Sequence, residues 1–347
     1  MSNIHADYIW VDTKLNTRFK RQIIRYPAEY IPKLSDFPEW NFDGSSTGQN
    51  VGTNTEVILK PKCFIKYLDK KFDKTIYLVL CDCYDSNDQP IESNTRYLAE
   101  HVFNKCLHKD IWFGIEQEYV FIDPKTQRVL GWPTDEVQNT GRNDVYCGVG
   151  VSTFDDDMKT GREIAEEHLY ACEESGIRIF GINREVLLGQ WEFQIDICTG
   201  IEASDQLTLA RHLLVRISER HNIQVSFNPK PVIGNWNGSG CHVNFSTKES
   251  RMPKTGYDMI LSYMEKLKAK HSEHLKVCGT NTLRLTGKHE TSSLTEFTYG
   301  VGDRSASVRI PTKTFKMRSG YIEDRRPASD CDPYLVTSMI AKTIFML

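Results

Sequence analysis

Five glutamates and one histidine carry the chemistry that this sequence indicates most strongly. They lie in short segments of alternating polar and apolar residues and are Glu116, Glu118, Glu185, Glu192, Glu323 and His242. Carboxylate oxygens suit hard divalent cations, and one imidazole among them favours Mg²⁺ or Mn²⁺ over Ca²⁺. Five arginines accompany this set: Arg284, Arg304, Arg309, Arg325 and Arg326. Carboxylates for a metal and arginines for an anion are the groups of a phosphoryl-transfer site, where charge stabilisation supplies most of the catalysis.

Strand alternation predicts how these side chains meet, because successive residues of a strand point to opposite faces. In 190–197 the apolar face is expected to hold Trp191, Phe193, Ile195 and Ile197, and the other face Gln190, Glu192, Gln194 and Asp196. Glu116 and Glu118 share a face, and His242 shares one with Asn244. If the three strands pair side by side, their polar faces enter one cavity. A plain solvated strand face is the alternative, but these faces lack the Lys and Thr usual on exposed strands.

Composition excludes several classes of protein. The 347 residues fit one large domain or two, and the net charge of −3 gives no global field for nucleic acid or a membrane surface. The first residues lack the pattern of a signal peptide, and no apolar stretch approaches the ~20 residues of a membrane span. The ten cysteines contain no Cys-x-x-Cys pair, which favours reduced thiols in a cytoplasmic protein over disulfides or a soft-metal site.

The chain changes character near residues 85–90, a turn-rich break. Before it we expect short strands and a Gly/Ser/Asn-rich loop at 41–54; after it, helical patterns occupy 94–108, 161–176, 204–222, 256–275 and 332–344. Ser204 is the expected N-cap of the third helix, and Asp332 with Pro333 opens the last. Helices alternate with ligand-bearing strands that lie close in sequence. This favours an α+β fold with domains at 1–88 and 89–347, the second built on a curved antiparallel sheet flanked by helices.

Taken together, the motifs resemble the type II, eukaryote-like glutamine synthetases. The resemblance runs from about residue 8 to the end and is carried by Trp-Asn-Phe-Asp-Gly-Ser-Ser-Thr at 40–47, Gln-Trp-Glu-Phe-Gln at 190–194, and the segments 112–118, 146–150, 234–242, 244–248, 284–292, 303–311 and 321–327. It implies a small N-terminal β-grasp domain, a larger catalytic domain, and an active site shared between neighbouring subunits in decamers of two pentameric rings. It also implies ATP, L-glutamate and ammonium as substrates, with Mg²⁺ or Mn²⁺, and no nucleic-acid or membrane partner.

The resemblance also assigns roles to single residues. One metal is expected on Glu118, Glu185 and Glu192, and a second, which bridges the ATP phosphates, on Glu116, His242 and Glu323. L-Glutamate is expected at Asn235, Trp236, Gly238, Arg284, Arg304 and Arg325. The nucleotide is expected at Trp112, Glu116, Glu192, Asn244, Phe245, Ser246, Arg251, Arg304, Arg309 and Tyr321. Three positions depart from the family pattern: Asp196-Ile197 replaces Gly-Pro beside the nucleotide, and Thr312 replaces an arginine.

Three residues are the expected catalytic groups: Asp43, Glu290 and Arg304. Ammonium has no free lone pair, so a carboxylate must bind it and take its proton, and Asp43 in the glycine-rich loop is the candidate base. Glu290 is expected to close the site against water, and Arg304 to neutralise the transferring phosphoryl group. Without the motif match, Asp43-Gly44 is simply a turn, His242 a core histidine and Arg325-Arg326 a surface pair.

The expected function is therefore ATP-dependent ligation of glutamate and ammonia through γ-glutamyl phosphate. Two alternatives stay open from the sequence: the same chemistry on another amine, or a catalytically silent structural homologue. A small cation suits Asp43 and Glu290, which argues against the first. All six expected metal ligands are present, which argues against the second.

Overall fold

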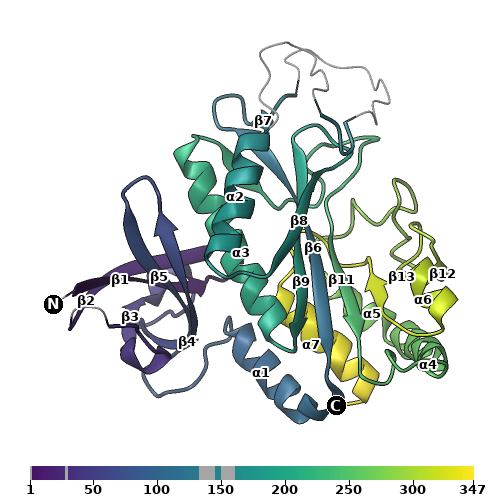
Figure 1. Cartoon of the computed structure of the whole chain (residues 1–347), viewed down its shortest axis with the longest axis horizontal. Coiled ribbons are helices and arrows are strands. Elements are labelled where there is room, and N and C mark those ends of the chain that lie inside the picture. Colours follow the sequence, from purple (N-terminus) through teal and green to yellow (C-terminus); the bar gives the residue numbers. More distant parts are fainter. Residues whose placement is uncertain (1, 28–29, 133–144, 150–160) are drawn as a thin grey trace.

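A computed structural model describes residues 2–27, 30–132, 145–149 and 161–347 of the chain. Two β-sheets lie side by side, a small one from the N-terminal segment and a large one from the rest, with helices against both (Figure 1). The predicted α+β fold is confirmed.

The small sheet has five strands in the order β2-β1-β5-β4-β3. Its members are β1 (Ser2–Val11), β2 (Thr17–Tyr26), β3 (Trp40–Asp43), β4 (Glu56–Asp69) and β5 (Lys74–Tyr84). Neighbouring strands are antiparallel except for the parallel β1–β5 pair in the middle.

Both faces of this sheet are covered. On β5, Val79 and Cys81 pack with Trp10 in a core of the sheet's own. Leu78 and Leu80, on the opposite face, belong to the main core of the molecule. Helix α3 (Glu202–Arg220) contacts β2 and β5 and so lies between the two sheets. A strand buried on both faces is expected to read as a continuous apolar run, as β5 does.

The large sheet is antiparallel apart from one parallel pair, β12–β13. Its main path runs β12-β13-β14-β11-β6-β9-β8, with β7 and β10 paired to β6. Its strands are β6 (Trp112–Asp123), β7 (Arg128–Val129), β8 (Ile179–Arg184), β9 (Gln190–Thr199), β10 (Gln224–Ser226), β11 (Cys241–Ser246), β12 (Tyr299–Val301), β13 (Val308–Ile310) and β14 (Ile322–Asp324). Strands β11, β6 and β9 are neighbours, so the predicted pairing of the three carboxylate- and histidine-bearing strands is confirmed.

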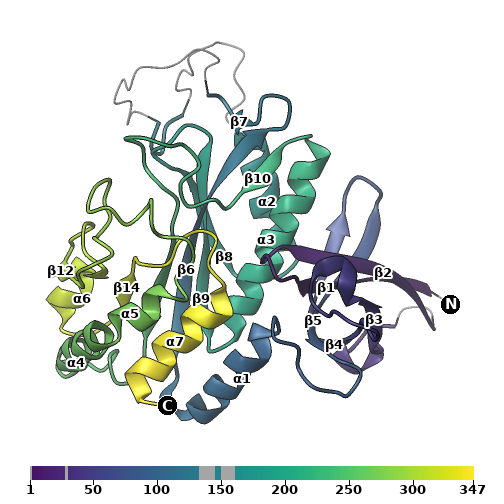
Figure 2. The same cartoon turned by 180° about the vertical axis from the view of Figure 1, so that it is seen from behind.

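Helices cover the apolar face of the large sheet, with α1 and α7 side by side along its lower edge (Figure 2). Besides α3, the α-helices of the described residues are α1 (Thr95–Lys105), α2 (Arg162–Glu174), α4 (Gly256–Ala269), α5 (His271–Leu275), α6 (Thr312–Met317) and α7 (Pro333–Phe345). Asp332 caps α7 as predicted, since its carboxylate accepts bonds from the N–H groups of Tyr334 and Leu335.

The predicted start of α3 is wrong. The helix begins at Glu202, two residues before Ser204, and Ser204 is buried inside its first turn. Its hydroxyl lies 3.0 Å from the carbonyl oxygen of Pro333 and joins α3 to α7. A hydroxyl that finds a partner on another helix does not need the capping position.

Two β-bulges interrupt the sheet at one end of β8 and β9. Between the pairs Phe113–Cys198 and Ile115–Ile195, β9 has one residue more than β6. In the pairing of β8 with β9, Ile179 lies opposite Ile195 and Gly181 lies opposite Gln194, so β8 has one extra residue, Phe180. A bulge reverses the alternation beyond it. For this reason the prediction that Ile197 lies on the apolar face is wrong: this residue is 48% exposed and lines the cavity described below.

Residues 85–94 connect β5 to α1. The domain limits 1–88 and 89–347 stay a prediction. Among the described residues no helix is long and apolar enough to cross a membrane.

Candidate active site

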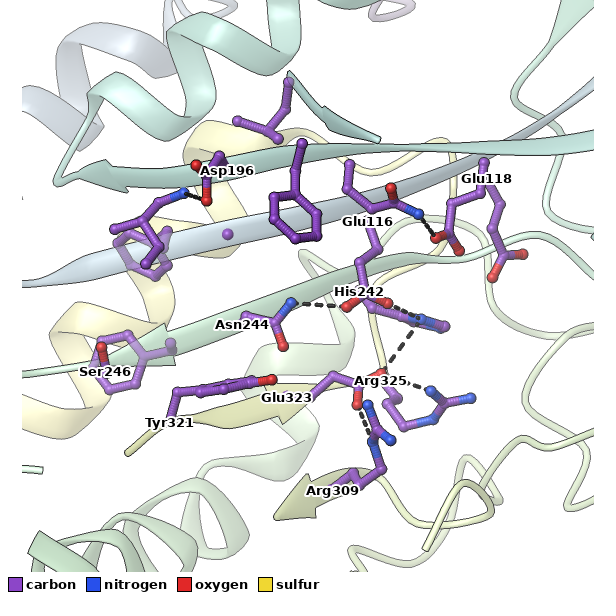
Figure 3. Close-up of a pocket in the computed structure, with 18 of the residues that line it drawn as sticks. Glu116, Glu118, Asp196, His242, Asn244, Ser246, Arg309, Tyr321, Glu323 and Arg325 are labelled. Carbon is purple, nitrogen blue, oxygen red and sulfur yellow. Dashed lines mark hydrogen bonds and ion pairs between the residues drawn. The ribbon is translucent and has the colours of Figure 1, made fainter. Parts of the chain in front are cut away.

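The polar face of the large sheet forms one wall of a cavity of about 1080 Å³ (Figure 3). Most of the predicted site residues line it: Trp112, Glu116, Glu118, Glu185, Glu192, His242, Asn244, Phe245, Ser246, Arg251, Glu290, Arg304, Arg309, Tyr321, Glu323 and Arg325. The remaining ones lie outside the lining: Asp43, Asn235, Trp236, Gly238 and Arg284.

Strand register brings the expected ligands together. His242 of β11 lies opposite Glu116 of β6, and Glu118 of β6 lies opposite Glu192 of β9. On the other side of β11, Asn244 faces Glu323 of β14. Directly opposed residues on neighbouring strands point to the same face, so the acidic groups meet although they are far apart in sequence.

Glu116, His242 and Glu323 form a compact set. Their ligand atoms all lie within 4.8 Å of one another, and no other such group of three occurs among the residues that the structure describes. His242 Nδ1 is 3.7 Å from Glu116 Oε2 and 3.6 Å from Glu323 Oε1. Burial and the charge of Arg325 lower the pKa of His242, which leaves the neutral imidazole that a metal requires. This donor set fits Mg²⁺ or Mn²⁺.

A second carboxylate set, Glu118, Glu185 and Glu192, lines the same cavity. Burial raises the pKa of all three carboxyls, and their mutual repulsion raises the pKa of Glu118 and Glu192 further. Buried acids of like charge are unfavourable without a cation, so these residues also fit a divalent metal.

Amide groups hold this second set in place. Gln190 Nε2 donates to Glu118 Oε2 at 3.0 Å, and the backbone N–H of Gly240 donates to the same oxygen at 2.9 Å. Asn183 Nδ2 donates to Glu185 Oε1 at 2.9 Å. Gln194 Nε2 bonds both Asn183 Oδ1 and Glu192 Oε1. The carboxylates are thereby oriented before any ligand arrives.

Arginines neutralise Glu323, which is completely buried. Arg325 Nη1 donates to its Oε1 at 2.6 Å, and Arg309 Nε bonds its Oε2 (Figure 3). Arg325 also donates to the carbonyl oxygens of Arg304 at 3.1 Å and Glu290 at 3.2 Å. One guanidinium therefore connects the Glu116–His242–Glu323 set to both loops that carry expected catalytic residues.

Arg284 lies behind this cluster and is buried. Its Nη2 is 3.2 Å from His242 Nε2, and Nη1 donates to Asn281 Oδ1 at 3.1 Å. Two glycines near Arg284 have no room for a side chain. A Cβ on Gly238 would stand 2.5 Å from the Pro229 carbonyl oxygen, and a Cβ on Gly240 would stand 2.5 Å from Arg284 Nη2. Gly238 therefore has a packing role, whatever it does for a substrate.

The opposite end of the cavity is aromatic. The Arg251 guanidinium lies 3.6 Å from the centre of the Trp112 ring and pairs with Asp110. Tyr321 and the bulged residues Phe180 and Ile197 complete this end. Trp112 is six positions before Glu118 on β6, so about 20 Å separates the two ends. That length fits a purine nucleotide whose phosphates reach the acidic centre.

Of the expected catalytic residues, two reach the cavity. Arg304 and Glu290 line it, and both interact electrostatically with Glu185. Asp43 lies in the small sheet, is exposed and does not line the cavity. Its carboxylate caps the 3₁₀ helix η2 (Gly44–Thr47) by accepting from Ser45, and these bonds lower the pKa of Asp43. Gly150 of the matched segment 146–150 lies outside the described residues.

Sequence reasoning missed several lining residues: Asn183, Phe180 and Lys313. Gln194 and Asp196, which alternation placed on the polar face with Glu192, line the cavity as expected. Phe180 enters the cavity only because of the bulge, for which the local sequence has no clear pattern. The Oδ1 atom of Asn244 is buried without a partner among the described residues, although Nδ2 donates to Glu116 at 2.8 Å. An unsatisfied acceptor there marks a place for a ligand donor.

Comparisons with known proteins agree with this geometry. The family model for the glutamine synthetase catalytic domain matches residues 92–344. The chain is 45% identical over 340 residues to a glutamine synthetase of Eremothecium gossypii, covering 98% of this chain and 89% of that protein. It is 44% identical over 344 residues to a cytosolic isozyme 1-1 from Oryza sativa, covering 98% and 93%. It is 45% identical over 343 residues to a glutamine synthetase of Schizosaccharomyces pombe, covering 99% and 92%.

Proposed function

We propose a residue-level mechanism for this chain, which belongs to the glutamine synthetase family and is an ATP-dependent glutamate–ammonia ligase. The observation that carries the mechanism is the compact Glu116–His242–Glu323 set beside Arg309 and Arg325. A direct exchange of a carboxylate oxygen for ammonia fails at neutral pH because the oxygen is a poor leaving group. Phosphorylation of the glutamate side chain by ATP provides a good one.

The family uses divalent metals, and two positions suit them in this cavity. Glu118, Glu185 and Glu192 would hold one ion and Glu116, His242 and Glu323 the other, with Mg²⁺ or Mn²⁺ as the ion. A bound cation supplies charge neutralisation to the phosphates of the nucleotide.

The two ends of the cavity divide the substrates. The nucleotide base occupies the aromatic end at Trp112, Phe245, Ser246, Arg251 and Tyr321, with Asn244 and Arg309 nearer its phosphates. L-Glutamate is assigned to Asn235, Trp236, Gly238, Arg284 and Arg325; of these, Arg325 lines the cavity and Arg284 contacts His242 from behind it. This placement sets the glutamate side-chain carboxylate between Arg304 and the phosphates. It is supported by the positions of the aromatic and cationic residues around the cavity.

Catalysis then proceeds in two steps. The glutamate carboxylate attacks the γ-phosphorus of ATP, the bond from that phosphorus to the β–γ bridging oxygen breaks, and ADP leaves with the electron pair; Arg304 neutralises charge on the group in transfer. Ammonia attacks the carbonyl carbon of γ-glutamyl phosphate, and phosphate leaves with the electron pair of the broken C–O bond. Glu290 limits the access of water, which would hydrolyse this intermediate.

Asp43 is the proposed base that binds ammonium and accepts its proton. It lies outside the cavity of its own chain, which supports a site completed by the small sheet of a neighbouring subunit. We therefore infer a homo-oligomer, a decamer of two pentameric rings, in which residues 1–88 of one subunit meet residues 89–347 of the next. Mixing inactive Asp43→Ala and Glu185→Ala variants and reassembling them should restore some activity. Full activity in a size-purified monomer contradicts the shared site.

The cytoplasm is the proposed location, because one relative is a cytosolic isozyme by name. The function itself is tested by following phosphate release from ATP with purified protein, omitting glutamate and ammonium in turn. Glutamine should form only when glutamate, ammonium, ATP and the divalent metal are all present. Robust activity with a polyamine and none with ammonium would instead identify a ligase for another amine.

A further inference from the structure

The loop that carries Glu290 has an unusual backbone. Its base is closed by a bridge between Thr286 and Ser293. Within it, Gly287, His289 and Glu290 have φ angles of 73°, 53° and 58°. Non-glycine residues in this left-handed region are strained by ~1 kcal/mol or more, so they persist only where contacts hold them.

Within the part of the chain that the structure describes, three hydrogen bonds join this loop to residues outside it. Arg325 Nη2 donates to the Glu290 carbonyl oxygen at 3.2 Å, and Thr291 Oγ1 donates to the Arg284 carbonyl oxygen at 3.0 Å. The third runs to a different segment: His289 Nε2 lies 2.9 Å from Asn235 Oδ1. These two residues are 54 positions apart, and their contact joins the loop to the segment expected to hold glutamate.

The chemistry of this contact fixes the orientation of the Asn235 amide. Oδ1 can only accept, so His289 Nε2 must donate. Burial and the nearby charges of Lys230 and Lys288 lower the pKa of His289, so its ring is neutral at pH 7. With Oδ1 engaged, the Asn235 Nδ2 group remains as a donor for a carboxylate.

We propose that His289 is a positioning residue that aims the Asn235 amide donor at L-glutamate and thereby couples glutamate binding to the seating of the Glu290 loop. The proposal rests on the proposed function, which assigns glutamate to Asn235 and exclusion of water to Glu290. A substrate held by a correctly oriented amide then also favours the conformation in which Glu290 faces the cavity.

A double-mutant cycle tests this coupling. His289→Asn shortens the side chain and removes the contact, while asparagine tolerates the left-handed backbone, so the variant should fold. His289→Gln retains an N–H donor of similar reach. His101→Gln is the control, because His101 is exposed and bonds only its own helix at Tyr97 among the described residues. Each variant is measured for glutamate KM, ATP KM, kcat and the ratio of phosphate released to glutamine formed.

His289→Asn should raise the glutamate KM about fivefold, the worth of one hydrogen bond, without changing the ATP KM. Its phosphate-to-glutamine ratio should rise above that of the wild type, and His289→Gln should restore both values. In the Asn235→Ala background, His289→Asn should add no further increase in glutamate KM.

Two results overturn the proposal and differ in meaning. In the first, Asn235→Ala raises the glutamate KM, but His289→Asn either leaves the KM unchanged or raises it further by its full factor in the double variant. His289 then does not act through Asn235, and the assignment of glutamate to Asn235 survives. If Asn235→Ala itself leaves the glutamate KM unchanged, the placement of glutamate in the proposed function fails as well.

Discussion

Replacing Glu323 should destabilise the metal-free protein, whereas replacing Glu192, another carboxylate of the same cavity, should not. Glu323 is completely buried and pairs with Arg325, whose side chain is 8% exposed, and Arg309, whose side chain is 21% exposed. Glu323→Ala leaves both cations without their partner. Glu192 instead faces other acids, and Glu192→Gln removes repulsion while an amide can still accept from Gln194.

The size of the first effect follows from burial. Removing one partner of a buried ion pair costs ~3–5 kcal/mol, and the partial exposure of Arg309 favours the lower value of ~3 kcal/mol. Unfolding entropy of about 2.1 cal/mol/K per residue gives about 0.7 kcal/mol/K for 347 residues. Glu323→Ala should therefore lower the Tm of the metal-free protein by about 4 °C. Glu192→Gln should leave it unchanged or raise it.

Thermal melting in the presence of a chelator measures both effects, and repeating it with Mg²⁺ or Mn²⁺ measures the stabilisation by the ion. Wild-type protein should gain stability with the metal, and both variants should gain less and lose turnover. The reasoning is refuted if Glu323→Ala melts like the wild type without metal, or if Glu192→Gln melts several degrees lower.

Asp43→Asn should lose most glutamine synthesis and raise the ammonium KM without lowering the Tm, because Asp43 is exposed; an unchanged ammonium KM would contradict its role. Glu290→Ala should release more phosphate than glutamine, since water reaches the acyl phosphate; equal amounts would show that another group excludes water. Burial lowers the pKa of His168 to about 4 and of His212 and His274 to about 3. The unfolded chain therefore binds more protons at these histidines between pH ~6.5 and those values, so each histidine should lower the stability by about 1.4 kcal/mol per pH unit below ~6.5. The raised pKa values of Glu118, Glu185 and Glu192 act in the opposite direction, so the test compares the change in denaturant midpoint from pH 7 to pH 5 between the wild type and His212→Asn. His212→Asn should lose less stability over this interval, and an identical change in both proteins would refute the reasoning.

Local alternation was enough to predict the acidic wall of the site. Glu116, Glu118, Glu192 and His242 share one face because a strand has a period of two, whatever surrounds it. The apolar residues opposite them predict the buried face equally well. The pairing of β11, β6 and β9 followed from the need to gather those polar faces, and the structure agrees.

Features that depend on contacts between distant segments could not be predicted from local sequence patterns. Ser204 looks like a helix cap in its local sequence, and only its contact with Pro333 places it inside α3. Ile197 fits the apolar face of β9 until the bulge opposite Gly114 reverses the alternation. The hydrogen bond of His289 to Asn235 depends on the folded path of both loops, so no spacing in the sequence predicts it.

The bulge in β9 also has a consequence for protein engineering. The register is regular at Glu118–Glu192 on one side of the bulge and again at Phe113–Cys198 and Trp112–Thr199 on the other. The extra residue of β9 thus lies within the pair Asp196 and Ile197, which line the cavity. A library of dipeptides at these two positions can vary the shape and charge of this part of the cavity while the strand pairing that aligns the acidic centre stays fixed. The same wall therefore combines a regularly paired segment that holds the acidic residues with an unpaired segment that is free to change, and one extra residue in β9 separates them.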